Sequence, residues 1–192
     1  CAGAARAFLK ARTEFRAKKA AHLTECAELK AASDRLVACL NDIAVTLGAY
    51  IGTAITIALQ SLAAGSGVAA ALTAISGSLA GLASTLSSIP FIGQALAVVA
   101  VAAIATLGVL AGLYAKNVYD ENQTRQACDV AFAAANAAHG AALNVCPVGG
   151  KCVPDFTETC NCPYATTAYK YYLTVGGAQT CFPDVYIWGD ES

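Results

Sequence analysis

Cysteine is the residue type through which this 192-residue sequence could do most covalent chemistry, because it has nine cysteines. It has no methionine, so the chain as given does not start at an initiator codon, and we expect that a secretory signal peptide has been removed. Many cysteines in an exported chain predict disulfides in an oxidising compartment, and hence a secreted, cell-surface or envelope-membrane protein. The cysteines expected to form disulfides are Cys26, Cys39, Cys128, Cys146, Cys152, Cys160, Cys162 and Cys181.

An odd number of cysteines leaves one sulfur over, and Cys1 is the natural candidate. An N-terminal cysteine is what lipoprotein processing leaves in bacteria, so lipidation or a link to a second chain is one interpretation, and a start that falls on cysteine by chance is the other. If two helical arms pair as described below, Cys26 lies within one helical turn of Cys128, which favours a disulfide between them. Cys39 faces another side of its helix and is expected to bond elsewhere, for example with the C-terminal segment.

No motif for catalysis or cofactor binding stands out. The serines and threonines of the apolar middle have no histidine or acid nearby to activate them, and Gly65-Ser66-Gly67 lacks the lysine of a phosphate loop. His22 and His139 each stand alone, and there is no Cys-x-x-Cys pair, so disulfides are favoured over zinc. We expect no enzyme, no metal, no cofactor and no small-molecule substrate. The net charge of −1 gives no reason to expect a nucleic acid.

The middle of the chain carries no charge at all. Hydrophobic residues make up 57% of the sequence and charged residues only 13%, about half of the usual share. Residues 43–115 contain no Asp, Glu, Lys, Arg or His, so all charges lie in the flanking parts. Such a stretch is expected to be covered by lipid or by other copies of the chain.

Three apolar segments, 43–64, 67–89 and 91–115, each have the roughly 20 residues that a helix needs to cross a bilayer. The first and third are rich in Ile, Leu and Val, whereas the second is weakened by Ser and Thr. If both flanking arms lie on one side of the membrane, the number of crossings is even. The first and third segments are then expected to cross, with the second re-entrant, interfacial or packed against them.

Each apolar segment contains one G-x-x-x-G, a spacing that lets two helix backbones approach closely in lipid. An Ala- and Gly-rich composition is the plainer explanation, although three pairs exceed the chance expectation of about one. The glycines predicted to mediate helix association are Gly48, Gly52, Gly77, Gly81, Gly108 and Gly112.

The flanking parts read as two helical arms. In residues 2–42 an apolar stripe recurs every seven residues, from Phe8 and Phe15 through His22 to Ile43, which predicts a helix packed as a coiled coil. The alternative is a helix lying on an anionic membrane. Residues 116–145 predict an Ala-rich return helix, and Asn122 begins a possible glycosylation sequon. The basic residues that would face lipid are Arg6, Lys10, Arg12, Arg16, Lys18 and Lys19.

The C-terminal residues 146–192 change abruptly to a Cys- and Tyr-rich composition. Residues 169–175 and 178–181, joined by Gly176-Gly177, predict a β-hairpin in a small disulfide-stapled cap. The expected fold is mainly α: a long antiparallel helical hairpin with an apolar helical block and this cap. Its four parts are the arm 1–42, the apolar block 43–115, the return helix 116–145 and the cap 146–192.

Membrane insertion with oligomerisation is the function that this organisation favours. It resembles α-helical pore-forming toxins, in which amphipathic soluble helices surround an uncharged hairpin that enters a bilayer, although the resemblance is of organisation only. The expected partners are a lipid bilayer, copies of the chain, or both. The alternative is a structural subunit of an extracellular filament, pilus-like tube or virion shell with its apolar helices buried between copies. A third option is a constitutive envelope protein.

Overall fold

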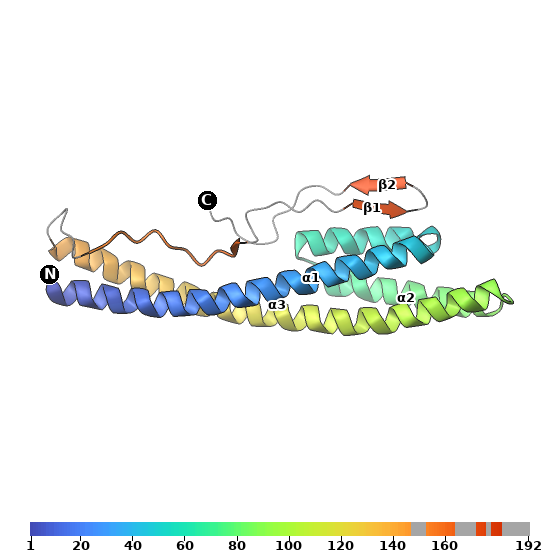
Figure 1. The fold of residues 1–192 in the computed structure, drawn as a ribbon, viewed down its shortest axis with the longest axis horizontal. Helices are drawn as coiled ribbons and strands as arrows, with labels where there is room; N and C mark the ends of the chain where they lie inside the picture. The colour runs from blue at the N-terminus through green and yellow to red at the C-terminus, as the bar shows by residue number, and fades with distance from the viewer. Residues whose placement is uncertain (147–152, 164–171, 176–177, 182–192) are drawn as a thin grey trace.

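The chain is mainly helical, as predicted. The structure is a computed structural model, and it describes residues 1–146, 153–163, 172–175 and 178–181. Its elements, drawn in Figure 1, are α1 (Ala2–Ala64), α2 (Val68–Ser87), α3 (Ile92–Val145), β1 (Tyr172–Val175) and β2 (Ala178–Cys181).

The strands β1 and β2 pair antiparallel, with Tyr172 opposite Cys181 and Val175 opposite Ala178. Most other residues of the predicted cap lie outside the described part of the chain. The cap and its stapling by disulfides therefore stay a prediction.

Two heptad stripes join the long helices into an antiparallel coiled coil (Figure 1). The stripe predicted in the first arm is confirmed, because Phe8, Phe15, His22, Leu29, Leu36 and Ile43 are all buried. The sequence analysis missed the matching stripe of α3, which also recurs every seven residues. Its members, most of them too small or too polar to stand out in a hydrophobic pattern, are Gly93, Ala100, Leu107, Tyr114, Glu121, Cys128, Ala135 and Ala142.

The first apolar segment is not one continuous helix. The backbone leaves helical geometry at Ile51 (φ −128°, ψ 18°), and residues 52–64 fold back along the preceding helix (Figure 1). The returning stretch buries Ile55, Leu59 and Leu62 in a core shared with α2 and α3. The prediction that residues 43–64 form one membrane crossing is therefore wrong, because the break leaves only 13 residues after it.

The boundaries between the three predicted apolar segments coincide with ends of helices. Gly65 ends α1 in a left-handed conformation (φ 65°), and the amide N–H groups of Gly65 and Ser66 donate to the carbonyls of Leu62 and Ser61. At the second break α2 ends at Ser87 and α3 begins at Ile92, with Pro90 between them.

Close backbone contact at this second turn depends on Gly93. A Cβ atom at that position would lie 2.5 Å from the carbonyl oxygen of Leu86 and 2.5 Å from the Cβ of Ile89. Gly77, on the open surface of α2, has nothing within 4 Å of the same added atom. The turn between α2 and α3 is therefore closed tightly by one glycine.

Replacing Gly93 by alanine is expected to lower the free energy of unfolding by about 1–3 kcal/mol, because the added methyl group overlaps backbone that cannot move freely. The matched change Gly77→Ala is expected to be neutral or stabilising by up to about 1 kcal/mol, through helix propensity. Urea unfolding in detergent micelles, followed by circular dichroism, measures both. Equal effects of the two changes would show that the turn is not closely packed.

Candidate functional site

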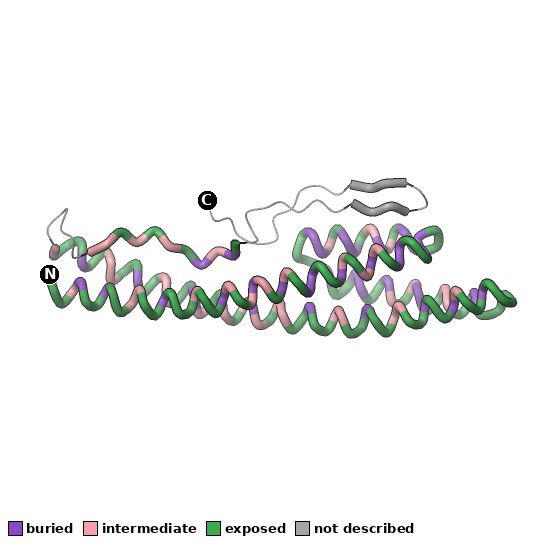
Figure 2. Tube along the Cα trace, in the orientation of Figure 1, coloured by how far each residue is buried: buried purple, intermediate pink, exposed green. Residues whose placement is uncertain are grey.

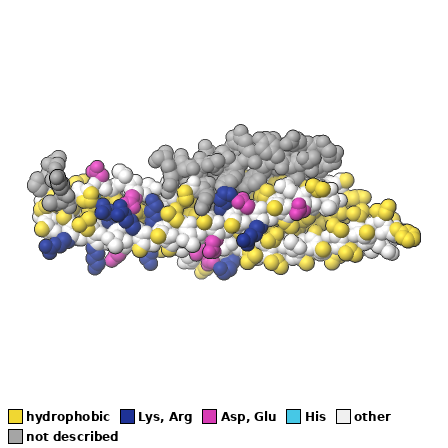
Figure 3. Space-filling model, viewed as in Figure 1, with side chains coloured by type: hydrophobic (Ala, Val, Ile, Leu, Met, Phe, Trp, Pro, Cys, Tyr) yellow, Lys and Arg dark blue, Asp and Glu magenta, His cyan; other side chains and the backbone are white. Residues whose placement is uncertain are grey.

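Residues 43–115 form the uncharged half of the molecule, which we call the apolar half. This half leaves most of its hydrophobic surface uncovered. By length and composition all three helices contain stretches able to cross a membrane, although that of α1 is interrupted at Ile51. Only 17% of the residues in the most apolar stretch of α3 are buried, and 28% in that of α2. Figure 2 shows the exposed residues along this part of α3, and Figure 3 shows hydrophobic side chains gathered over the same half. Large exposed apolar surfaces of this kind mark membrane or protein contacts.

The most exposed large hydrophobic side chain among the described residues, Phe91, lies at the turn between α2 and α3. Phe91 is 88% exposed and Ile92 76% exposed, with Ile89 beside them. We call residues 88–92 the hairpin tip. Further exposed apolar side chains continue along α3 from the tip, namely Val98, Val101, Val109 and Leu113.

The apolar lengths of α2 and α3 match each other. The 20 residues of α2 span about 30 Å, and residues 92–115 of α3 span about 36 Å. At the base of the pair, Val68 and Tyr114 line one cavity of about 650 Å³ together with Val118, so α2 starts where the charged part of α3 begins. The unbroken membrane-length pair is therefore α2 with α3, whereas the sequence analysis predicted the first and third segments.

Four of the six glycines predicted to associate helices lie on open surface. Gly77, Gly81, Gly108 and Gly112 are exposed, and a Cβ at any of them would meet nothing within 4 Å. Gly48 and Gly52 are instead buried, on either side of the break at Ile51. Within one chain, the four exposed glycines bring no helices together.

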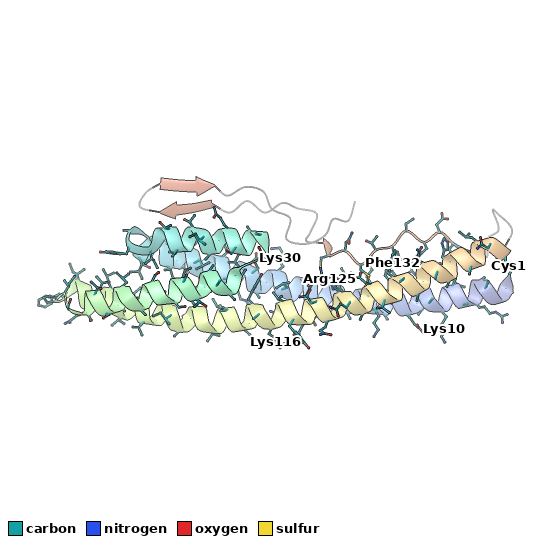
Figure 4. The ribbon with its side chains drawn as sticks, turned by 180° about the vertical axis from the view of Figure 1, so that it is seen from behind. Cys1, Lys10, Lys30, Lys116, Arg125 and Phe132 are labelled. Atoms are coloured by element: carbon teal, nitrogen blue, oxygen red, sulfur yellow. A yellow bond between two sulfur atoms is a disulfide. The ribbon has the colours of Figure 1, made fainter. Side chains whose placement is uncertain are left out.

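We call the part built from residues 1–42, 116–146 and 153–163 the charged half. The predicted lipid-facing basic residues lie there, at the end with the chain start and away from the hairpin tip (Figures 3 and 4). Arg6, Lys10, Arg16 and Lys18 are exposed there, while Arg12 lies over the Phe8 ring at 5.6 Å. The apolar stripe of this helix is buried against α3. The structure therefore has the predicted coiled coil and not the alternative, since the buried stripe is not free to lie on a membrane.

An extended segment, residues 153–163, runs along the coiled coil of the charged half (Figure 1), and we call it the strap. Its Phe156 ring contacts Phe8, Phe15 and Phe132, with centroids 5.4–5.8 Å apart, and lies 6.1 Å from His139. From the sequence, His139 stood alone, with no expected partner. In the structure it lies against Phe8, with ring centroids 4.8 Å apart.

The strap is also held by an ion pair. The Arg16 Nε atom donates to Glu158 Oε1 over 2.8 Å. This hydrogen bond is the main reason that the pKa of the Glu158 carboxyl is lowered. Burial raises that pKa by a smaller amount, and the positive charge of Arg16 lowers it further. Glu158 therefore stays charged at neutral pH and keeps its hold on α1.

Three disulfides tie the charged half together: Cys1–Cys146, Cys26–Cys162 and Cys128–Cys160. The predicted Cys26–Cys128 bond is wrong, because the strap lies against both helices and takes a sulfur from each. The register also differs. Because the straight part of α1 ends at Ile51, Cys1 faces Cys146, and the α3 side chain beside Cys26 is Glu121.

The two remaining predictions about Cys1 and Cys39 have different outcomes. The sulfur of Cys1 is bonded to Cys146, so in this structure it carries neither a lipid nor a link to a second chain. Cys39 is the free cysteine in the described part of the chain, half-buried, and burial raises the pKa of its thiol. Cys152 and the side chain of Cys181 lie outside what the structure describes, so a bond from Cys39 to the cap stays a prediction.

Asn122 and His22 both lie within the charged half. The Asn122 side chain is half-buried in the middle of α3, and its Oδ1 accepts a hydrogen bond from Arg125 over 2.7 Å. His22 is 1% exposed. Burial lowers its pKa, against the opposing effect of the Glu121 carboxylate, so the ring is neutral at neutral pH.

The substitution Glu158→Gln is expected to weaken the hold of the strap on α1 at about pH 7, and its effect is expected to shrink as the pH falls below 4.5. The folded-state pKa of Glu158 is lowered, so its stabilisation is complete above the unfolded value of 4.5 and is lost as the pH falls through the lower folded value. Urea midpoints over this pH range measure the effect, with Glu14→Gln on the exposed surface as the control. A pH-independent difference from the unmodified protein would contradict the ion pair.

Comparison with known proteins gives no family for this chain. No protein-family model matches it, and no curated protein and no solved structure is significantly similar to it. Any function must therefore be argued from the uncovered apolar surface and the geometry that holds it.

Proposed function

We propose that this protein is a non-catalytic, membrane-active protein that inserts the α2–α3 hairpin into a lipid bilayer and oligomerises there. The observation that carries the proposal is the small buried share of the apolar stretches of α2 and α3 in the isolated chain. Moving apolar surface out of water is favourable by about 25 cal/mol for each Å² that is buried.

The hairpin tip leads the insertion. It consists of apolar and hydroxyl side chains, and no charged residue lies between it and Lys116 on α3. Complete burial of a side chain such as Phe91 or Ile92 is worth about 1.5–3 kcal/mol. Because α2 and α3 enter together, both return to the same side of the bilayer, where the two charged arms lie together.

The serines and threonines of α2 do not prevent it from entering lipid. Thr73 Oγ1 donates to the carbonyl of Ala69, Ser78 Oγ to that of Ala74, and Thr85 Oγ1 to that of Gly81. A hydroxyl that bonds within its own helix needs no water, which lowers the cost of transferring it to lipid. The hydroxyl groups that make this segment less apolar in the sequence thus find hydrogen-bond partners in their own helix.

A charge boundary fixes how deep the hairpin goes. Lys116 is the first charged residue on α3 after the apolar stretch, and its Nζ lies 2.9 Å from Asp120 Oδ2. This hydrogen bond raises the pKa of Lys116, which keeps it charged at neutral pH. Charged side chains at the end of a span remain at the membrane surface.

Oligomerisation uses the glycines that the single chain leaves open. Gly77 and Gly81 on α2, and Gly108 and Gly112 on α3, offer two small-residue strips on the uncovered surface. In lipid such strips allow close packing between helices of neighbouring copies. Copies that cover one another without lipid are the alternative, which gives a filament or tube.

The test is leakage of dye from liposomes with the substitution Phe91→Glu. A charge on the tip has to pass through the hydrocarbon, at about 2.5–3.5 kcal/mol on insertion scales, so we expect at least about a tenfold loss of leakage. The control is Val130→Glu, which puts the same charge at a similarly exposed apolar site, 72% exposed, in the charged half of α3. That variant is expected to leak like the unmodified protein.

Two outcomes would contradict the proposal. One is that the unmodified protein releases no dye, and the other is that Phe91→Glu releases as much as Val130→Glu. Ordered polymers seen by electron microscopy in lipid-free buffer, together with intact liposomes, would favour the filament instead.

A further inference from the structure

Four side chains of types that bind zinc meet where α1, α3 and the strap come together. His22 and Cys26 lie one turn apart on α1, Glu121 comes from α3, and Cys162 comes from the strap. All four are buried, and one ligand atom of each lies within 4.8 Å of all the others. The sequence analysis predicted no metal site, because residues from three distant segments give no recognisable spacing.

The distances from His22 to the two sulfurs match edges of a tetrahedral zinc site. Its Nε2 atom lies 3.5 Å from Cys26 Sγ, 3.6 Å from Cys162 Sγ and 3.8 Å from Glu121 Oε1. Zinc bonds to these ligand types measure about 2.0–2.3 Å, which places neighbouring ligand atoms of a tetrahedron about 3.3–3.8 Å apart. The two edges from Nε2 to the sulfurs therefore already have the length of a zinc site, whereas Glu121 Oε1 would have to move closer.

The position of Thr124 is compatible with the histidine tautomer that a metal needs. The Thr124 hydroxyl donates to the backbone carbonyls of Asp120 and Glu121, over 3.1 and 3.0 Å. Its oxygen lies 3.3 Å from His22 Nδ1, and it accepts the Nδ1–H in the tautomer with the proton on that nitrogen. Nε2 then carries the lone pair, and it faces the two sulfurs and the carboxylate. A partner of this kind on the second ring nitrogen is usual for metal-binding histidines.

In that tautomer no side-chain proton donor among the described residues faces Nε2 while the disulfide is closed. A carboxylate and a disulfide sulfur have no proton to donate to Nε2, although the atom is buried beside Glu121 and both sulfurs. A buried lone pair and a buried carboxylate that face each other are stabilised by a cation between them. The carboxylate, the imidazole and two sulfurs together suit zinc better than calcium or magnesium, which prefer oxygen ligands.

We propose that His22, Cys26, Glu121 and Cys162 bind one zinc ion when the Cys26–Cys162 disulfide is reduced. In the structure the two sulfurs are bonded to each other, with Cα atoms 6.0 Å apart. A dithiol reductant supplies two electrons and two protons, which break the S–S bond and give two thiols, while the dithiol closes to its own disulfide. The thiols then release their two protons as both sulfurs bind Zn²⁺.

The metal would replace one cross-link by another. The disulfide joins α1 to the strap, whereas a zinc ion with these ligands joins α1, the strap and α3. The charged half then stays closed under reducing as well as oxidising conditions.

Cobalt binding to the reduced protein tests this site, because tetrahedral Co²⁺ with sulfur ligands has strong visible bands and a sulfur-to-metal charge-transfer band. The full chain in detergent is reduced with a phosphine, desalted without oxygen and titrated with Co²⁺ and then Zn²⁺. We expect one tetrahedral Co²⁺ per chain, displaced by Zn²⁺, and none in the oxidised protein. The spectrum should be lost in His22→Gln and Cys162→Ser and retained in the matched controls His139→Gln and Cys160→Ser.

A milder variant separates ligation from folding. Thr124→Val keeps the side-chain shape but removes the acceptor of Nδ1–H, so it should weaken metal binding by about 10–100-fold while the spectrum stays tetrahedral. If reduction alone lowers the helix content, added Zn²⁺ should restore it in the unmodified protein and not in His22→Gln. A reduced protein that binds no Co²⁺, or a His22→Gln variant that binds it as tightly as the unmodified chain, would overturn the proposal.

Discussion

The apolar surface of α2 and α3 is the feature on which the rest of this structure depends. A water-soluble protein buries such surface in its own interior, but here the described helices do not enclose it. The folded-back residues 52–64 cover one side of the bundle and leave much of α3 open. In the proposed function a bilayer covers the remainder, since its thickness and chemistry match the α2–α3 hairpin.

The charged half holds this hairpin in one orientation. Because α3 runs from Ile92 to Val145 as one helix, the apolar stretch and the charged arm behave as one rod. The coiled coil with α1, the aromatic contacts of Phe156 and three disulfides fix that rod. The two longest disulfide loops, with separations of 145 and 136 residues, each stabilise the fold by at most about 5 kcal/mol in the chain-entropy account.

The helices and their turns were predictable, because the signals for them are local. The stripe through Phe8 and Phe15, the left-handed glycine at the end of α1 and Pro90 between α2 and α3 each act on neighbouring residues. The break at Ile51 was missed because the glycines on either side of it, Gly48 and Gly52, were assigned to helix association. Ile55 and Leu59 after the break pack in a core built from distant elements, which the sequence does not show. That break shifts the register of the arms, so the disulfide partners of Cys26 and Cys128 could not be deduced. The strap has no periodicity, and neither its path nor the meeting of His22 with Glu121 is visible in the spacing.

Sedimentation velocity in detergent-free buffer tests the central claim, that the chain cannot cover its own apolar half. It should be run on the folded, disulfide-intact protein over a range of micromolar concentrations, with helix content checked by circular dichroism. The account predicts that no monomer is found, and that the protein sediments as assemblies which dissolve into small species when detergent is added. A single, concentration-independent species with the mass of one chain, fully helical in plain buffer, would contradict it.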